Sequence, residues 1–200
     1  LKHASIQETH EKTFQVGIQL AQNAPSPVKS LNIGGGFGIP YFPGESALDI
    51  AAIGHNLKRL LPEIKKELPE AQIVIELGRY MVAEAGVYVC RVLERKLSRG
   101  QVFLVTDGGL HHQLAASGNF GQVIRKNYPV TIGNNVKSNE QEIVSIVGPL
   151  CTPLDLLGDK MELPKVEVND LIVIMQSGAY GLTASPTAFL GHPVAAEVLV

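Results

Sequence analysis

The sequence predicts two segments of different fold class, an α/β segment over residues 1–82 and an all-β segment over residues 83–200. In the first segment, strand, loop, helix and second strand follow one another, an order typical of a βαβ unit with parallel strands. In the second, short β-rich runs alternate with turns, and helical periodicity is scarce. This pattern is typical of a separate β-sandwich or β-barrel domain.

The α/β segment contains two expected helices and two expected strands. Apolar residues recur at helical spacing over residues 5–24 and again from Ser46 onward. Ser46 is the expected N-cap of the second helix, and Pro62 is expected to divide that helix into two pieces. Short apolar runs over residues 28–33 and 72–76 predict the two buried strands.

The all-β segment contains five runs with strand composition. Each run is short, rich in branched apolar residues and bounded by turn residues. The expected strands cover residues 87–93, 101–106, 129–132, 142–147 and 170–175.

Composition excludes several classes of protein. The chain has 200 residues, of which 45% are hydrophobic and 18% charged, and its formal charge is −2. This balance offers no basic surface for nucleic acid or an anionic membrane, and no apolar run reaches the length of about 18 residues that spans a bilayer. The start LKHASIQETHEK lacks the apolar core of a signal peptide. We therefore expect no nucleic-acid or membrane partner.

The two cysteines, Cys90 and Cys151, have neither metal-site spacing nor a disulfide framework, which favours a reducing cytoplasm. Cys90 lies in an apolar run and is expected to be a small buried residue. His111 and His112 are adjacent, and adjacent residues of an extended strand point to opposite faces. They are therefore not expected to bind a metal together, and no metal site is predicted.

Three consecutive glycines follow the first expected strand, where active sites of parallel α/β structures lie. Gly34, Gly35 and Gly36 allow main-chain N–H groups to approach an anion that side chains would block. The alternative is a tight turn, for which one or two glycines suffice. The pattern is not the dinucleotide fingerprint, because the third glycine is misplaced and no helix follows directly.

The second expected strand ends on Glu76-Leu77-Gly78-Arg79, a carboxylate followed three residues later by a guanidinium. Taken alone, the pair is equally typical of a surface ion pair or of an acid that starts a helix. Combined with the glycines one βαβ unit earlier, the two loops form a phosphate-plus-cation arrangement, which favours a functional site.

Four motifs together resemble one enzyme family. Gly34–Gly36, Glu76–Arg79, Cys151-Thr-Pro-Leu-Asp155 and Gly178-Ala-Tyr180-Gly181 occur in the order and approximate spacing of the fold-type III pyridoxal-phosphate decarboxylases, the ornithine, diaminopimelate and arginine decarboxylase group. The sequence around these motifs resembles that of decarboxylase-like proteins associated with bacterial exosortase and exopolysaccharide loci. The resemblance implies that residues 1–82 are the last two strands and helices of an alanine-racemase-like TIM barrel, and that residues 83–200 are the β domain.

The resemblance also implies roles for individual residues. Six residues would hold the phosphate of pyridoxal 5′-phosphate through main-chain groups or side chains. They are Gly34, Gly35, Gly36, Gly78, Arg79 and Tyr180. Glu76 would hydrogen-bond the pyridine nitrogen and keep it protonated, which makes the ring an electron sink. Cys151 would cross the interface of a homodimer and help to protonate the carbanion. Without the resemblance, Cys151 would be taken as a small buried residue.

Residues near the expected substrate pocket depart from the family pattern. Thr152 stands where an acid commonly binds a distal amine, Ala115 stands where diaminopimelate decarboxylase has an arginine, and Leu77 replaces a proline. These changes argue against diaminopimelate or a simple diamine precursor as substrate. Asp155 and Phe189, with Thr152, are the candidate substrate-binding residues, although core packing is an alternative for Phe189.

The lysine that forms the Schiff base in the family lies upstream of any residue in this chain. The chain is therefore expected to be the C-terminal half of a homodimeric decarboxylase acting on an amino acid or a derivative, incomplete and inactive alone. A racemase-like enzyme of the same fold is an alternative, because the fold also resembles alanine racemase. A non-catalytic homologue that binds a protein partner is another.

Overall fold

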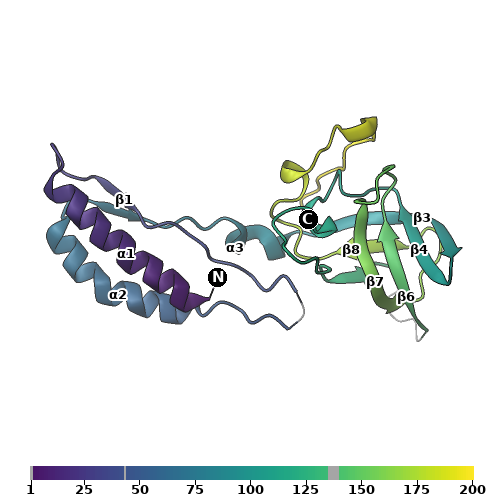
Figure 1. Ribbon diagram of the computed structural model, residues 1–200, viewed down its shortest axis with the longest axis horizontal. Coiled ribbons are helices and arrows are strands. Elements are labelled where there is room, and N and C mark those ends of the chain that lie inside the picture. The colour runs from purple at the N-terminus through teal and green to yellow at the C-terminus, as the bar shows by residue number, and fades with distance from the viewer. Residues whose placement is uncertain (1, 43, 135–139) are drawn as a thin grey trace. The chain divides into compact units, whose positions relative to one another are not determined.

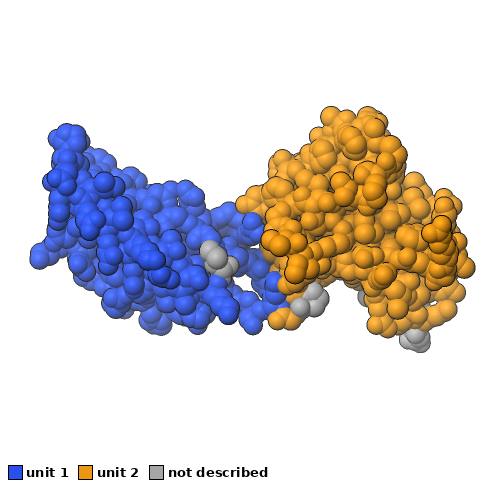
Figure 2. Space-filling model, viewed as in Figure 1, with its two compact units in different colours: residues 1–40, 45–81 blue, residues 41–44, 82–200 orange. Residues whose placement is uncertain are grey.

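The computed structural model describes residues 2–42, 44–134 and 140–200. The chain divides into two compact units (Figure 2), with unit 1 formed by Leu1–Pro40 and Glu45–Met81 and unit 2 by Tyr41–Gly44 and Val82–Val200. The division after Met81 falls one residue before the boundary expected from the sequence. No helix among the described residues is long and apolar enough to cross a membrane.

Unit 1 is a βαβ unit with one additional helix. Its elements are α1 (His3–Gln22), β1 (Ser30–Asn32), α2 (Ile50–Glu67) and β2 (Gln72–Val74). The strands pair in parallel, as the sequence predicted, and α1 packs beside α2 (Figure 1). The short helix α3 (Arg79–Val82) lies at the division between the units.

Two apolar clusters stabilise unit 1. Phe14, Ile33, Ile64 and Leu68 form one, which joins both helices to the end of β1. The second consists of Ile6, Phe37 and Ile53, and Phe37 belongs to the loop that follows the three glycines. The loop is therefore anchored to the helices by a buried aromatic ring.

Two predictions about α2 are wrong. The helix begins at Ile50, and its N-cap is Asp49, whose side chain accepts a hydrogen bond of 2.9 Å from Ala52 N, so Ser46 lies before the helix. Pro62 lies inside one continuous helix. Ile53 and Ile64 are buried on the same face, and this packing outweighs the single backbone hydrogen bond that proline removes.

Unit 2 is built on a mixed six-stranded sheet in the order β5-β8-β3-β4-β6-β7. Its strands are β3 (Tyr88–Ser98), β4 (Gln101–Thr106), β5 (Val130–Ile132), β6 (Gln141–Val147), β7 (Leu156–Pro164) and β8 (Leu171–Ile174). The edge strands β5 and β7 also approach each other, so the sheet is a nearly closed barrel. The all-β class is therefore confirmed, and all five expected strands are present.

The pairing of β4 with β6 determines where the loops of unit 2 meet. These two strands are parallel, whereas all other pairs in the sheet are antiparallel. The loops that follow β4 and β6 therefore leave the same end of the sheet. The core beneath them is apolar and fully buried, and includes Val92, Leu104, Val144, Ile146, Leu157, Ile172 and Ile174.

Candidate functional site

The glycine loop of unit 1 requires all three glycines. Gly34 and Gly36 have φ values of 79° and 84°, which glycine adopts without strain. At Gly35, a Cβ atom would lie 2.2 Å from the backbone oxygen of Glu76, so no side chain fits. The loop is tied to β2 because Glu76 N donates to Gly34 O at 2.9 Å. The main chain therefore passes directly against the segment that carries the expected carboxylate.

Asn32, the last residue of β1, organises this junction. Its Nδ2 donates to Glu76 Oε1 at 2.6 Å, and its Oδ1 accepts from Gly34 N at 2.8 Å. The Glu76 carboxylate is exposed but its orientation is defined by this bond. Asn32 was not among the residues predicted from the sequence, where its signal is a polar side chain between Leu31 and Ile33, just before the glycines. Because the N–H of Gly34 is already used, Gly35 and Gly36 are the stronger main-chain donors for an anion.

Gly78 and Arg79 follow Glu76 at the start of α3. Both are exposed, and Gly78 O accepts from Met81 N at 3.1 Å in the first turn. Unit 1 therefore carries the glycine loop, an oriented carboxylate and a cation on consecutive segments after β1 and β2.

In unit 2, Asp155 joins the loops that follow β4 and β6. Its buried carboxylate accepts hydrogen bonds from Leu110 N at 2.6 Å and from Leu150 N at 2.9 Å. A Cβ atom at Gly109 or Gly148 would lie 2.2 Å from a carboxylate oxygen of Asp155, so both glycines are needed around it. Burial raises the pKa of Asp155, and the two main-chain donors oppose that rise.

This arrangement does not support the expected contact of Asp155 with a substrate. The residue is only 3% exposed, and both of its oxygens bind main-chain N–H groups. It is instead a positioning residue for the loop that carries Cys151. The physical reason is that a buried carboxylate needs hydrogen-bond donors, and the nearest ones belong to the chain itself.

Cys151 and Thr152 lie on the loop that Asp155 positions. Cys151 is an exposed free thiol, directly after Leu150. The Thr152 hydroxyl accepts from Leu154 N at 3.3 Å. Cys90, by contrast, is buried as predicted, and burial raises the pKa of its thiol to about 12. Of the two cysteines, only Cys151 is accessible to solvent in the chain.

Tyr180 and Phe189 are both partly exposed on the C-terminal turns of unit 2. Tyr180 has a φ of 55°, a conformation that non-glycine residues seldom adopt and that is enriched at functional sites. Its ring centroid lies 5.7 Å from that of Phe120. The preceding Gly178 is pressed against the main chain, because a Cβ atom there would lie 1.9 Å from Val82 O. The backbone therefore holds the Tyr180 turn tightly.

The expectation that His111 and His112 point to opposite faces is wrong. Both lie in a turn in which Gly109 O accepts from His112 N, so they are not on an extended strand, and their ring centroids are 3.9 Å apart. Burial, with His112 and His192 nearby, lowers the pKa of His111 to about 4. Among the described residues, no group of three or more His, Cys, Asp or Glu side chains could hold a metal ion.

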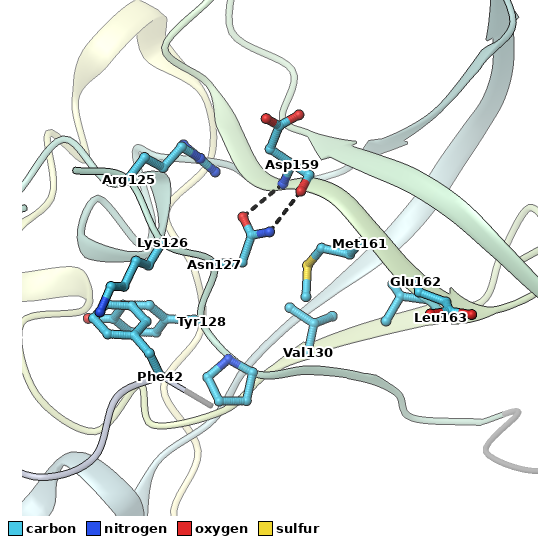
Figure 3. A pocket seen from close by; sticks show the side chains of 11 residues that line it. Phe42, Arg125, Lys126, Asn127, Tyr128, Val130, Asp159, Met161, Glu162 and Leu163 are labelled. Carbon is cyan, nitrogen blue, oxygen red and sulfur yellow. Dashed lines mark hydrogen bonds between the residues drawn. The ribbon is translucent and has the colours of Figure 1, made fainter. Parts of the chain in front are cut away.

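A cavity of about 720 Å³ in unit 2 is lined by none of the site residues predicted from the sequence (Figure 3). Two of its polar side chains, those of Arg125 and Asn127, bind the chain itself. Asn127 pairs with the main chain of Asp159 through two hydrogen bonds of 2.7 and 2.9 Å, and the Arg125 guanidinium donates to Ser117 O and Leu156 O. The cavity is therefore bordered by a structural joint between the 125–130 segment and β7.

Comparison with solved structures identifies the class of fold. The chain superposes on AQ1208 from Aquifex aeolicus with a TM-score of 0.83 and 26% identity, covering 100% of this chain and 46% of that one. Diaminopimelate decarboxylase from Methanocaldococcus jannaschii gives a TM-score of 0.79 at 25% identity, with 92% of this chain and 41% of that chain covered. The chain therefore has the fold of slightly less than half of each of these longer chains.

The family model of the pyridoxal-dependent decarboxylase C-terminal sheet domain matches residues 37–178. The chain therefore belongs to this family, which is that of the fold-type III pyridoxal-phosphate decarboxylases. The L-glutamyl-[BtrI acyl-carrier protein] decarboxylase of Niallia circulans is 42% identical over 98% of this chain and 46% of its own length. The diaminopimelate decarboxylase of Aquifex aeolicus is 30% identical over 96% of this chain and 43% of its own length. The chain spans about half the length of these relatives. The family resemblance and its cofactor are thereby confirmed.

Proposed function

We propose that this chain is the C-terminal half of a pyridoxal-phosphate-dependent decarboxylase that acts on an amino acid or an amino-acid derivative. The observation that carries the proposal is the junction of Gly35 with Glu76, where the absence of a side chain lets the glycine loop pass against the backbone of Glu76, whose carboxylate is oriented by Asn32. Its residue types fit the cofactor, because a phosphate needs N–H donors and a cation while a pyridinium nitrogen needs a carboxylate. When bound, pyridoxal phosphate supplies an electron sink for the electron pair left by departing CO2.

The residues of unit 1 would bind and orient the cofactor. Main-chain N–H groups of Gly35 and Gly36, together with Gly78 and the Arg79 guanidinium, would hold the phosphate. Glu76 would hold a proton at the pyridine nitrogen. Asn32 acts through Glu76, because it donates to one carboxylate oxygen at 2.6 Å and so sets the direction of the other.

The residues of unit 2 would act on the phosphate and on the substrate carbon. Tyr180 would donate its hydroxyl hydrogen to the phosphate. In the proposed homodimer, Cys151 would serve the site of the second subunit and deliver a proton to the α-carbon after CO2 leaves. The support is that Cys151 is exposed and that its loop is positioned by the buried Asp155. Phe189, with 44% of its surface exposed, is available to pack beside a substrate.

We propose that the substrate carries no free charge at the end away from the reacting carbon. Thr152 and Ala115 stand where charged recognition groups are expected, and Ala115 is buried. The relative from Niallia circulans, named for a glutamyl group on an acyl-carrier protein, supports a tethered aminoacyl substrate. A group linked to a carrier no longer has a free charge at the linkage.

Intact mass of the natively expressed protein after borohydride reduction tests the proposal. Reduction fixes lysine-bound pyridoxal phosphate as a stable adduct. We expect a mass well above the 21.5 kDa of this chain, with one pyridoxyl-phosphate group, and CO2 release from a glutamyl thioester in preference to free glutamate. A native protein without any adduct would refute the enzyme assignment and favour a non-catalytic homologue that binds a protein partner.

A further inference from the structure

Gln113 has an unsatisfied side chain in the interior of unit 2. It is 1% exposed, and neither its Nε2 nor its Oε1 has a hydrogen-bond partner among the described residues. Its main chain is fixed, because Gln113 N donates to Gly109 O at 3.1 Å in the turn after β4. An unpaired buried amide costs about 1–3 kcal/mol, so this position is unfavourable unless another molecule supplies the partners.

Gln113 lines a pocket of about 280 Å³ in unit 2 that also borders Tyr180 and Gly181. The amide lies close to the Tyr180 turn, since a Cβ atom at Gly181 would be 3.5 Å from Gln113 Oε1 and 3.7 Å from Nε2. Glycine at position 181 therefore places no side chain against the amide on that side. The pocket is small enough to take one functional group rather than a whole substrate.

The polar side chains of Tyr88, His112 and Ser177, which also line the pocket, already have partners. In its neutral form, His112 donates from Nε2 to Pro193 O at 2.7 Å and accepts at Nδ1 from the Tyr88 hydroxyl at 3.0 Å. The Ser177 hydroxyl donates to Ile174 O at 3.0 Å. Among the lining residues, Glu197 alone carries a carboxylate, ammonium or guanidinium group, and it is exposed. The pocket thus has one exposed carboxylate, that of Glu197, and one buried amide without a partner among the described residues, that of Gln113.

We propose that this pocket binds a neutral amide group of the substrate through Gln113. An amide ligand satisfies both ends of the side chain, because its N–H donates to Oε1 and its carbonyl accepts from Nε2. A carboxylate only accepts and leaves Oε1 unpaired, whereas an ammonium only donates and leaves Nε2 unpaired. The inference rests on the proposed function for its assignment to a substrate, and it specifies what replaces the missing charged recognition groups.

Binding of two simple probes to the natural full-length protein tests this inference without any turnover. Butyramide and butyrate differ only in ending as an amide or a carboxylate. Saturation-transfer NMR is expected to show butyramide binding at least tenfold tighter than butyrate. Equal binding of the two, or no binding of butyramide, would overturn the proposal. Because the readout needs no reaction, its failure is distinguishable from the absence of a pyridoxyl adduct.

Two variants separate recognition from structure. Gln113→Met keeps the side-chain volume and removes both hydrogen-bonding ends, so butyramide binding should fall at least tenfold while the melting temperature is unchanged or higher. The control is Gln122→Met. In the natural chain the Gln122 amide donates to Ala115 O and accepts from Lys126 N, so its loss should lower stability while butyramide binding persists. Retained butyramide binding in Gln113→Met would show that this amide does not recognise the ligand. A melting temperature several degrees lower would show that the amide is structural. Either result would overturn the proposal.

Discussion

Replacing Asp155 by asparagine should loosen the loop that carries Cys151. Asparagine keeps one acceptor oxygen but places an NH2 group against either Leu110 N or Leu150 N, which now lie 2.6 and 2.9 Å from the carboxylate. A hydrogen bond to a charged group contributes about 1.5–3 kcal/mol, and a buried donor without a partner adds a cost of its own. The expected local loss is about 2–3 kcal/mol, which corresponds to roughly 30- to 160-fold faster opening at that amide.

Hydrogen exchange measured by mass spectrometry on the full-length protein reads this opening directly. Peptides that contain Leu110 and Leu150 should exchange faster in Asp155→Asn, and kcat should fall more than KM changes, because Cys151 loses its position. The matched control is Asp107→Asn, since Asp107 is exposed and accepts one main-chain hydrogen bond, from Arg91 N at 2.8 Å. If neither leucine amide exchanges more than threefold faster, Asp155 does not position this loop.

Three further changes give separable outcomes. Glu76→Gln should lower kcat by orders of magnitude while cofactor absorbance is retained, because the pyridine nitrogen loses its charged partner; unchanged turnover would refute the electron-sink role. Gly35→Ala should cost about 1–3 kcal/mol in a thermal melt, because its methyl group meets Glu76 O, whereas Gly54→Ala on α2 has open space and should be neutral or stabilising. The folded-state pKa of His111, about 4, lies below the ordinary value of 6.5, so the unfolded chain binds more protons between these values. Its contribution, roughly 3 kcal/mol, is complete above pH 6.5 and is lost as the pH falls toward 4. Melting temperatures recorded across this range should show the loss, and His111→Phe should reduce it; an equal loss in the variant would contradict the assignment.

Strands with clear apolar runs were predictable, whereas β7 was not. Residues 72–76 and 101–106 are short apolar runs, and both regions form strands because they can bury apolar side chains. Leu156–Pro164 mixes glycine, aspartate and lysine with apolar residues and shows no alternation. It becomes a strand because it pairs with β6, with which it shares two register shifts. Such long-range pairing leaves no local pattern.

The turn at His111 and His112 was also missed, because its geometry depends on Gly109. The carbonyl of Gly109 accepts from both His112 N and Gln113 N, and the glycine itself is required by the nearby Asp155 carboxylate. Asp155 lies 45 residues further along the chain than Leu110, which it binds. No sequence window that covers one loop contains the other.

By itself, the sequence determined the family, the division into an α/β and an all-β segment, and the glycine loop beside Glu76. These features depend on short stretches of sequence, because a run of glycines or apolar residues has the same backbone and burial preferences wherever it occurs. Only the tertiary structure decided that Asp155 binds main-chain groups of two loops, that Asn32 orients Glu76, and that the amide of Gln113 is buried without a partner among the described residues. Burial and hydrogen bonding between distant residues depend on which segments the fold brings together, and that is a property of the packed chain.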